Sequence, residues 1–147
     1  MGVLIVAGYI AWRCLRWQHA ERLRSVPRVP IEELRRLLRG TDPPVIIDVR
    51  SVSMQRAESG LIPGALAADL GALTRHPLMP FKGREVVLYC SCPNEVSAAA
   101  GALILQRRGH ARVRVLLGGL EAWVVAEDLM RSPSRDPGIV AGDAAPT

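Results

Sequence analysis

The chain has 147 residues, of which 49% are hydrophobic and 22% charged; this is the size of one domain with a short arm, and too apolar for a disordered chain. The formal net charge of +5 comes from residues 1–39, where eight Arg against three Glu already give +5, so residues 40–147 are neutral. Because the basic residues lie in the arm and only 4% of residues are aromatic, little surface is available for stacking bases, and we expect no nucleic-acid partner.

Residues 1–27 are predicted to form an apolar, then basic, helical arm. Residues 1–12 have no charge, but Arg13 and Arg16 follow at once, and a membrane span needs roughly 20 apolar residues. This order argues against a cleaved signal peptide, in which the charge comes first. It indicates the end of a span, with Trp and Arg at the interface. We expect residues 1–24 to attach the chain to a membrane with the domain in the cytoplasm. A soluble cytoplasmic protein, with the arm packed on its own domain, is the alternative.

Pro27 and Pro30 end the arm, so the domain is predicted to span residues 28–130. Apolar spacing predicts a helix over 31–38, ended by Gly40. Apolar, β-branched runs predict buried strands over 45–49, 85–90 and 113–117, with a strand end and a short helix over 66–73. Further helices are expected over 97–108, closed by Gly109, and over 120–128. This alternation predicts the α/β class, with a central parallel sheet and helices on both faces. Residues 131–147 are expected to be a disordered tail.

Cys90 is the candidate catalytic residue, because it ends the strand predicted over 85–90. Sites in open parallel sheets form at the carboxyl ends of strands. The next helix, expected to begin near Asn94 or Glu95, would direct unpaired N–H groups toward the sulfur and favour a thiolate or persulfide anion. An inert buried cysteine is the alternative. The chain has three cysteines, an odd number that argues against a disulfide framework and favours a reducing compartment.

Several motifs occur in a fixed order: DVR at 48–50, IPGA at 62–65, VVLYC at 86–90, a five-residue loop, and LLGGLEAW at 116–123. Together they resemble the rhodanese family over residues 28–128. The resemblance implies the rhodanese-like fold, with Cys90 accepting sulfane sulfur and passing it to a nucleophile. Gly118, Gly119 and Trp123 match the GGxxxW motif of the family, which we interpret as important for the fold rather than for catalysis. The resemblance implies an active-site loop whose backbone N–H groups would hold the anion and which consists of Ser91, Cys92, Pro93, Asn94 and Glu95. The implied supporting residues are Asp48 and Arg50.

Glu95 stands where many catalytic rhodaneses have Arg, and Pro93 stands where they have Gly. A like charge at about 6 Å costs on the order of 3 kcal/mol at an effective dielectric near 20. We therefore expect thiosulfate, a dianion, to be a poor donor. The alternative is that Glu95 only complements the helix N-terminus and points to solvent.

Cys92 is expected either to resolve a persulfide, to form an easily reduced disulfide with Cys90, or to be an incidental loop residue. No metal or cofactor is expected, because two cysteines supply too few ligands and His76 and His110 are predicted to lie on the surface. A phosphatase of related fold would need the arginine of a C-x5-R loop. Counting from Cys90, that position is Val96, so we set this activity aside.

The sequence thus predicts a rhodanese-type sulfurtransferase or persulfide carrier, with a sulfane-sulfur donor and a thiol acceptor as partners. The alternative is a catalytically silent rhodanese-like module that binds a partner or regulates a membrane system. The loop YCSCPNE at 89–95 and the arm also resemble the rhodanese modules that follow the last helix of DedA-type bacterial membrane proteins. This narrower resemblance implies a bacterial membrane setting.

Overall fold

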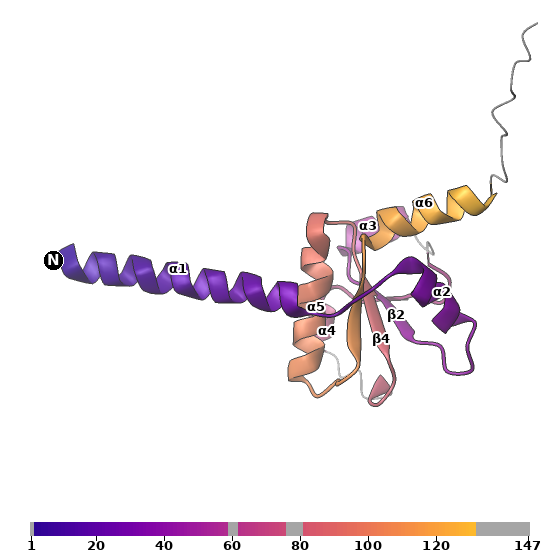
Figure 1. The fold of residues 1–147 in the computed structure, drawn as a ribbon, viewed down its shortest axis with the longest axis horizontal. Helices are drawn as coiled ribbons and strands as arrows, with labels where there is room; N and C mark the ends of the chain where they lie inside the picture. Colours follow the sequence, from indigo (N-terminus) through magenta and orange to yellow (C-terminus); the bar gives the residue numbers. More distant parts are fainter. Residues whose placement is uncertain (1, 59–61, 76–80, 132–147) are drawn as a thin grey trace, which may run out of the picture.

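A computed structural model describes residues 2–58, 62–75 and 81–131 of the chain. Five parallel strands form one sheet in the order β1-β5-β4-β2-β3. The predicted α/β class with a central parallel sheet is therefore confirmed (Figure 1). The strands are β1 (Arg28–Val29), β2 (Val45–Asp48), β3 (Leu66–Ala67), β4 (Val86–Tyr89) and β5 (Val113–Leu116).

Helices cover both faces of this sheet. The end of α1, with α4 and α5, packs on one face, and α2 and α6 pack on the other. The predicted two-sided covering is confirmed. The helices are α1 (Gly2–Ser25), α2 (Ile31–Leu38), α3 (Val52–Ala57), α4 (Leu70–Arg75), α5 (Val96–Arg107) and α6 (Gly119–Arg131), and a short 3-10 helix η2 (Pro93–Glu95) precedes α5.

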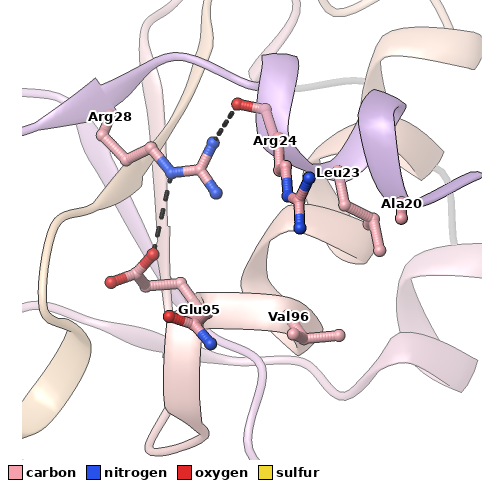
Figure 2. Close-up of a pocket in the computed structure, with 7 residues that line it drawn as sticks. Ala20, Leu23, Arg24, Arg28, Glu95 and Val96 are labelled. Carbon is pink, nitrogen blue, oxygen red and sulfur yellow. Dashed lines mark hydrogen bonds and ion pairs between the residues drawn. The ribbon is translucent and has the colours of Figure 1, made fainter. Parts of the chain in front are cut away.

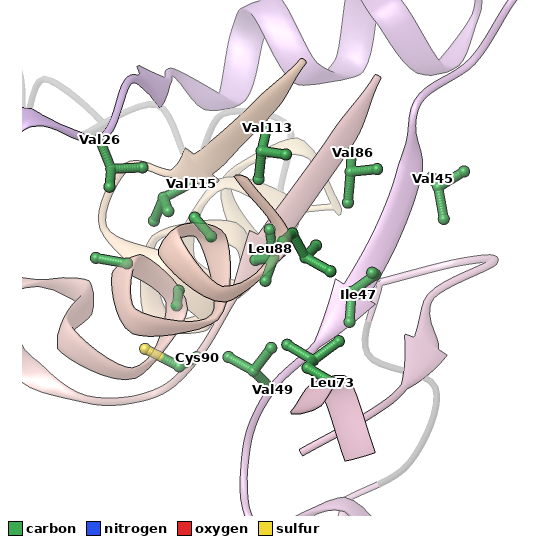
Figure 3. Close-up of a cluster of buried hydrophobic side chains, with 14 residues drawn as sticks. Val26, Val45, Ile47, Val49, Leu73, Val86, Leu88, Cys90, Val113 and Val115 are labelled. Carbon is green, nitrogen blue, oxygen red and sulfur yellow. The ribbon is translucent and has the colours of Figure 1, made fainter. Parts of the chain in front are cut away.

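The larger core lies between the sheet and α5 (Figure 3). Ala98, Ala99 and Ala102 are fully buried, so this helix approaches the strands closely. A Cβ atom on Gly101 would lie only 2.8 Å from the Leu88 side chain. The small residues near the start of α5 therefore hold its N-terminal end against the carboxyl end of β4, where Cys90 lies.

The arm forms one continuous helix, α1, which projects away from the domain (Figure 1). Its last turns contact α5, and Leu23 packs against the core beside the buried Val26. The large apolar residues nearer its start are exposed, from Val3 to Trp17. Among the described residues, no helix is both long enough and apolar enough to cross a membrane.

Three details of the fold differ from the sequence prediction. No helix was predicted between residues 50 and 64, but α3 forms there, and Ser51 caps it by accepting a hydrogen bond from the Met54 N–H. The two-residue strand β1 is too short for a hydrophobic pattern to reveal. Helix α6 extends to Arg131, beyond its expected end at 128. The predicted tail, apart from residue 131, lies outside the described residues.

Candidate active site

Cys90 directly follows β4 and lies beneath a cavity of about 250 Å³. The residue is buried, with 2% of its surface exposed. Its carbonyl oxygen accepts a hydrogen bond from the Leu120 N–H, which ties the end of β4 to the start of α6. The cavity is lined by Val49, Arg50, Ser51, Met54, Cys90, Ser91, Cys92 and Ser97.

Cys90 and Cys92 form a pair of free thiols in direct contact, with their Sγ atoms 2.6 Å apart. Burial, together with the hydrogen bond to Cys92, raises the pKa of Cys90 to about 11. Burial acts on Cys92 in the same direction, but the hydrogen bonds from Cys90 and Ser97 prevail and lower the pKa of Cys92. Since two thiolates in contact repel each other, the pair loses its first proton mainly from Cys92.

The N-terminal end of α5 faces this pair of sulfur atoms. The Ser97 N–H donates to Cys92 Sγ at 3.3 Å, and backbone hydrogen bonds from Cys92 and Ala98 act against the raised pKa of Cys90. The predicted direction of the helix N-terminus is thus confirmed. These hydrogen bonds act in the expected direction, toward the Cys90 thiolate, but desolvation of the buried sulfur outweighs them and leaves the pKa of Cys90 raised.

The donors match only part of the predicted set, the backbone of residues 91–95: the Cys92 N–H acts on Cys90, but two other members of the set do not. Pro93 has no N–H group, and the Glu95 N–H is bonded to the Cys92 carbonyl oxygen within the loop. Ser97 and Ala98, which the sequence prediction did not include, supply N–H groups instead. The signal that could have found them is the helix start, which lies at Val96 rather than near Asn94.

Asp48 and Arg50 form a buried ion pair next to the cavity. The Arg50 Nη2 lies 2.8 Å from Asp48 Oδ2, and the two side chains are only 1% and 8% exposed. Arg50 also donates to the carbonyl oxygen and the carboxylate of Glu58. Among the described residues, Arg50 is the only cationic residue in the cavity lining. Its guanidinium already binds the carboxylates of Asp48 and Glu58, so it is not free to bind an incoming anion.

Glu95 points neither into this cavity nor to solvent. Both Asn94 and Glu95 have left-handed backbone angles, with φ of 55° and 51°, which reverse the chain before α5. The Glu95 carboxylate accepts from the Gly118 N–H at 2.8 Å and lies 3.7 Å from the Arg28 Nε (Figure 2). Its side chain is 13% exposed. The alternative of a solvent-facing carboxylate disagrees with this geometry, and the charge expected beside the sulfur is paired with Arg28 and lies outside the cavity lining.

A family model for the rhodanese-like domain matches residues 30–126. The chain belongs to the rhodanese-like family. The match spans strands β2 to β5, the cavity and the pair Cys90 and Cys92. The narrower resemblance to modules of DedA-type proteins has no counterpart in these comparisons. A search of curated proteins found no match.

Solved structures similar to this chain include other rhodanese-like domains. A rhodanese-like domain protein from Staphylococcus aureus has a TM-score of 0.54 and 22% identity, covering 66% of this chain and 90% of that one. The human single-domain sulfurtransferase has a TM-score of 0.55 and 22% identity, covering 69% and 97%. A protein of unknown function from Rhodopseudomonas palustris, described as a possible tyrosine phosphatase, has a TM-score of 0.60 and 23% identity, covering 74% and 87%. At these identities the likeness shows the fold alone.

In this rhodanese-like domain the two glycines after β5 permit a close approach to the active-site strand. Gly118 and Gly119 have φ of 76° and 57°. A Cβ atom on Gly119 would overlap the Cys90 carbonyl oxygen. Trp123, the third residue of this motif, is buried in the core formed with α2 and α6. These positions are consistent with the fold-forming role that the sequence suggested for them.

Within the described residues, no group of three His, Cys, Asp or Glu side chains lies close enough to hold a metal ion. His110 was expected on the surface but is only 4% exposed; it follows the last turn of α5, where its backbone N–H donates to the Leu105 carbonyl oxygen. Burial lowers the pKa of His110, as do the nearby Lys82 and Arg108. His76 lies outside the described residues.

Proposed function

We propose that this rhodanese-like domain is a sulfurtransferase or persulfide carrier that accepts sulfane sulfur on Cys90. The observation that supports this most is the placement of Cys90 Sγ: at the carboxyl end of β4, under a cavity, and facing the N-terminal end of α5. A persulfide adds one sulfur atom beyond Sγ, so its negative charge would lie further out in the cavity. There, backbone N–H groups and the partial positive charge of the helix N-terminus stabilise an anion.

The donor in this proposal is a low-molecular-weight persulfide or polysulfide, and the acceptor is a thiol. Thiosulfate carries two negative charges, and the cavity offers no unpaired cation among the described residues, since Arg50 is bound to Asp48 and Glu58. We therefore expect poor use of thiosulfate because Arg50 is paired, rather than because Glu95 repels the anion.

Sulfur transfer to cyanide tests this function. The full chain carrying Cys92→Ser, which leaves no second thiol at the site to compete with cyanide, is incubated with glutathione persulfide and cyanide, and thiocyanate is measured. We expect thiocyanate above the spontaneous background, no excess in Cys90→Ser, and an unchanged rate in Cys14→Ser, which removes an exposed cysteine on α1. A Cys90→Ser rate equal to that of the parent chain would refute the proposal.

The second candidate is a catalytically silent binding module, which the raised pKa of Cys90 favours. A buried thiol is a weak nucleophile at neutral pH because little of it is ionised. Tyrosine phosphatase activity, suggested by the description of one similar structure, gains no support here, since the C-x5-R position holds Val96 on the exposed side of α5. The cyanide assay separates the silent module from the transferase.

We further propose that α1 attaches the domain to a membrane, as in the rhodanese modules of DedA-type bacterial proteins. The support is the exposure of its apolar side chains: Val3 is 82% exposed and Ile5 73%. Arg16 lies 4.7 Å from the ring centroid of Trp12, the pairing of aromatic ring and cation common at the interface of anionic membranes. The domain would then lie on the cytoplasmic side.

A further inference from the structure

We propose that Cys92 is a resolving thiol, which attacks a persulfide on Cys90 and releases the outer sulfur as hydrosulfide. The chain would then reduce sulfane sulfur as well as carry it. This inference rests on the proposed function, because it requires a persulfide on Cys90. It assigns Cys92 a catalytic role in a further activity, the reduction of a persulfide by a pair of vicinal thiols.

The contact between the two sulfur atoms is the first argument. Cys92 Sγ lies 2.6 Å from Cys90 Sγ, and both residues line the same cavity. The Ser97 N–H, at 3.3 Å, fixes the position of Cys92 Sγ from the N-terminal turn of α5. A nucleophile held beside the atom that it attacks competes well against any thiol that must diffuse in.

The chemistry of the two thiols is the second argument. Cys90 is the more buried residue, while Cys92 is partly exposed at the cavity. The Ser97 N–H donates to Cys92 Sγ and helps to lower the pKa of Cys92. This hydrogen bond does not depend on the Cys90 thiol, so it still stabilises a Cys92 thiolate after Cys90 has taken up sulfur. Thiol exchange proceeds by attack of such a thiolate on a divalent sulfur atom.

The proposed reaction has three steps, in each of which atoms and electrons balance. The Cys90 thiolate attacks the outer sulfur of a persulfide R–S–SH, giving Cys90–S–SH and R–S⁻. The Cys92 thiolate then attacks Cys90 Sγ, so that the bond to the outer sulfur breaks, a Cys90–Cys92 disulfide forms and HS⁻ leaves. The sulfane sulfur gains two electrons, and the two cysteine sulfurs lose them. An external thiol or dithiol reduces the disulfide and restores the pair.

A single-turnover experiment on the full chain tests this inference. The chain carries Cys14→Ser so that only the active-site cysteines remain. After reduction and removal of the reductant, it is mixed without oxygen with one equivalent of glutathione persulfide. Hydrosulfide is measured, and intact mass and peptide mapping are recorded without reductant. The same is done with Cys92→Ser, Cys92→Ala and Cys90→Ser added.

With both cysteines present, we expect hydrosulfide in amounts stoichiometric with the chain and a mass lower by two hydrogen atoms. Cys92→Ser and Cys92→Ala are expected to keep one added sulfur on Cys90 and to release little hydrosulfide. If the chain with both cysteines retains the added sulfur as these variants do, the inference is overturned while the proposed function stands. If Cys90→Ser releases hydrosulfide as fast as the parent, the inference also fails. If no variant gains sulfur or releases hydrosulfide, the proposed function itself fails.

Discussion

At the scale of single residues, the active site is governed by the unequal environments of Cys90 and Cys92. The same helix N-terminus faces both thiols, yet their pKa values shift in opposite directions. Desolvation acts to raise both pKa values, but the hydrogen bonds from Cys90 and Ser97 prevail at Cys92 and lower its pKa. Which thiol is ionised therefore depends on burial and on these hydrogen bonds together, and this sets the pH at which each can react.

The first prediction concerns alkylation of Cys90 by iodoacetamide in the Cys14→Ser chain. Only the thiolate reacts, and the pKa of Cys90 is raised to about 11, so its rate should increase about tenfold per pH unit through the neutral range and level off only near pH 11. Cys92 should react at lower pH. Cys92→Ala removes the hydrogen bond that helps to raise the pKa of Cys90, so the Cys90 profile should move to lower pH. Peptide mapping at each pH gives the two rates. A Cys90 rate already at its plateau at pH 7 would contradict the prediction.

At the scale of secondary structure, the turn between β5 and α6 positions the active-site strand. The Leu120 N–H bonds to the Cys90 carbonyl oxygen at 3.0 Å, and this approach is open only because Gly119 has no side chain. The Gly118 N–H in turn bonds to Glu95 in the loop. The turn therefore holds the end of β4 through the Cys90 carbonyl oxygen and holds the loop through the Glu95 carboxylate.

Gly119→Ala should destabilise the domain more than Gly83→Ala. Both glycines have positive φ, so each substitution costs about 1–2 kcal/mol of backbone strain. At Gly83 a Cβ atom would meet nothing within 4 Å, whereas at Gly119 it overlaps the Cys90 carbonyl oxygen and adds about 1–3 kcal/mol. Urea unfolding of the two variants measures the difference. Equal losses of stability would mean that the close approach does not matter.

Glu95→Gln and Glu95→Ala should separate the charge of this residue from its hydrogen bond. Gln keeps an acceptor for the Gly118 N–H and loses only the ion pair with Arg28, which should change the unfolding free energy by at most about 1 kcal/mol. Ala loses both contacts and should cost about 1–3 kcal/mol. Because the carboxylate faces away from the cavity, Gln should leave the alkylation rate of Cys90 unchanged. A clear rise in that rate would indicate that the Glu95 carboxylate repels the Cys90 thiolate, as first expected from the sequence.

The strands and the main helices could be predicted from the sequence because their apolar runs are long and fully buried, as at 45–48 and 86–89. The positions of Cys90 and of the helix N-terminus followed from this order of elements. The direction of the Glu95 side chain could not be predicted, because it depends on two successive left-handed residues and on a partner, Gly118, from a distant segment. The raised pKa of Cys90 depends on packing by α5, which local sequence does not describe.

At the scale of the whole molecule, a compact domain is joined to a projecting apolar helix. The helix is anchored to the domain at its last turns, where Leu23 packs against the core. A second cavity, of about 390 Å³, lies at this junction and is bordered by Arg24, Arg28 and Glu95 (Figure 2). The last turns of α1 thus lie beside the active-site loop, while its first turns expose their apolar side chains.

Binding to vesicles of phosphatidylglycerol and phosphatidylcholine should require the apolar side chains of α1. Each such side chain contributes about 1.5–3 kcal/mol when buried, so Ile5→Asp should weaken cosedimentation of the full chain by at least about tenfold. Leu129→Asp, which changes a similarly exposed residue on α6, is the matched control and should bind as the parent does. Absence of binding by the parent chain, or equal binding by Ile5→Asp, would contradict membrane attachment through the arm.

The most direct test of the account is the mass of the Cys92→Ser chain after treatment with glutathione persulfide, because removal of Cys92 leaves a Cys90 persulfide without a neighbouring thiol. The account predicts a gain of one sulfur atom, located on Cys90 by peptide mapping and absent when Cys90→Ser is added. A chain that gains no sulfur, or gains it equally with Cys90→Ser, would contradict the central claim that Cys90 accepts sulfane sulfur.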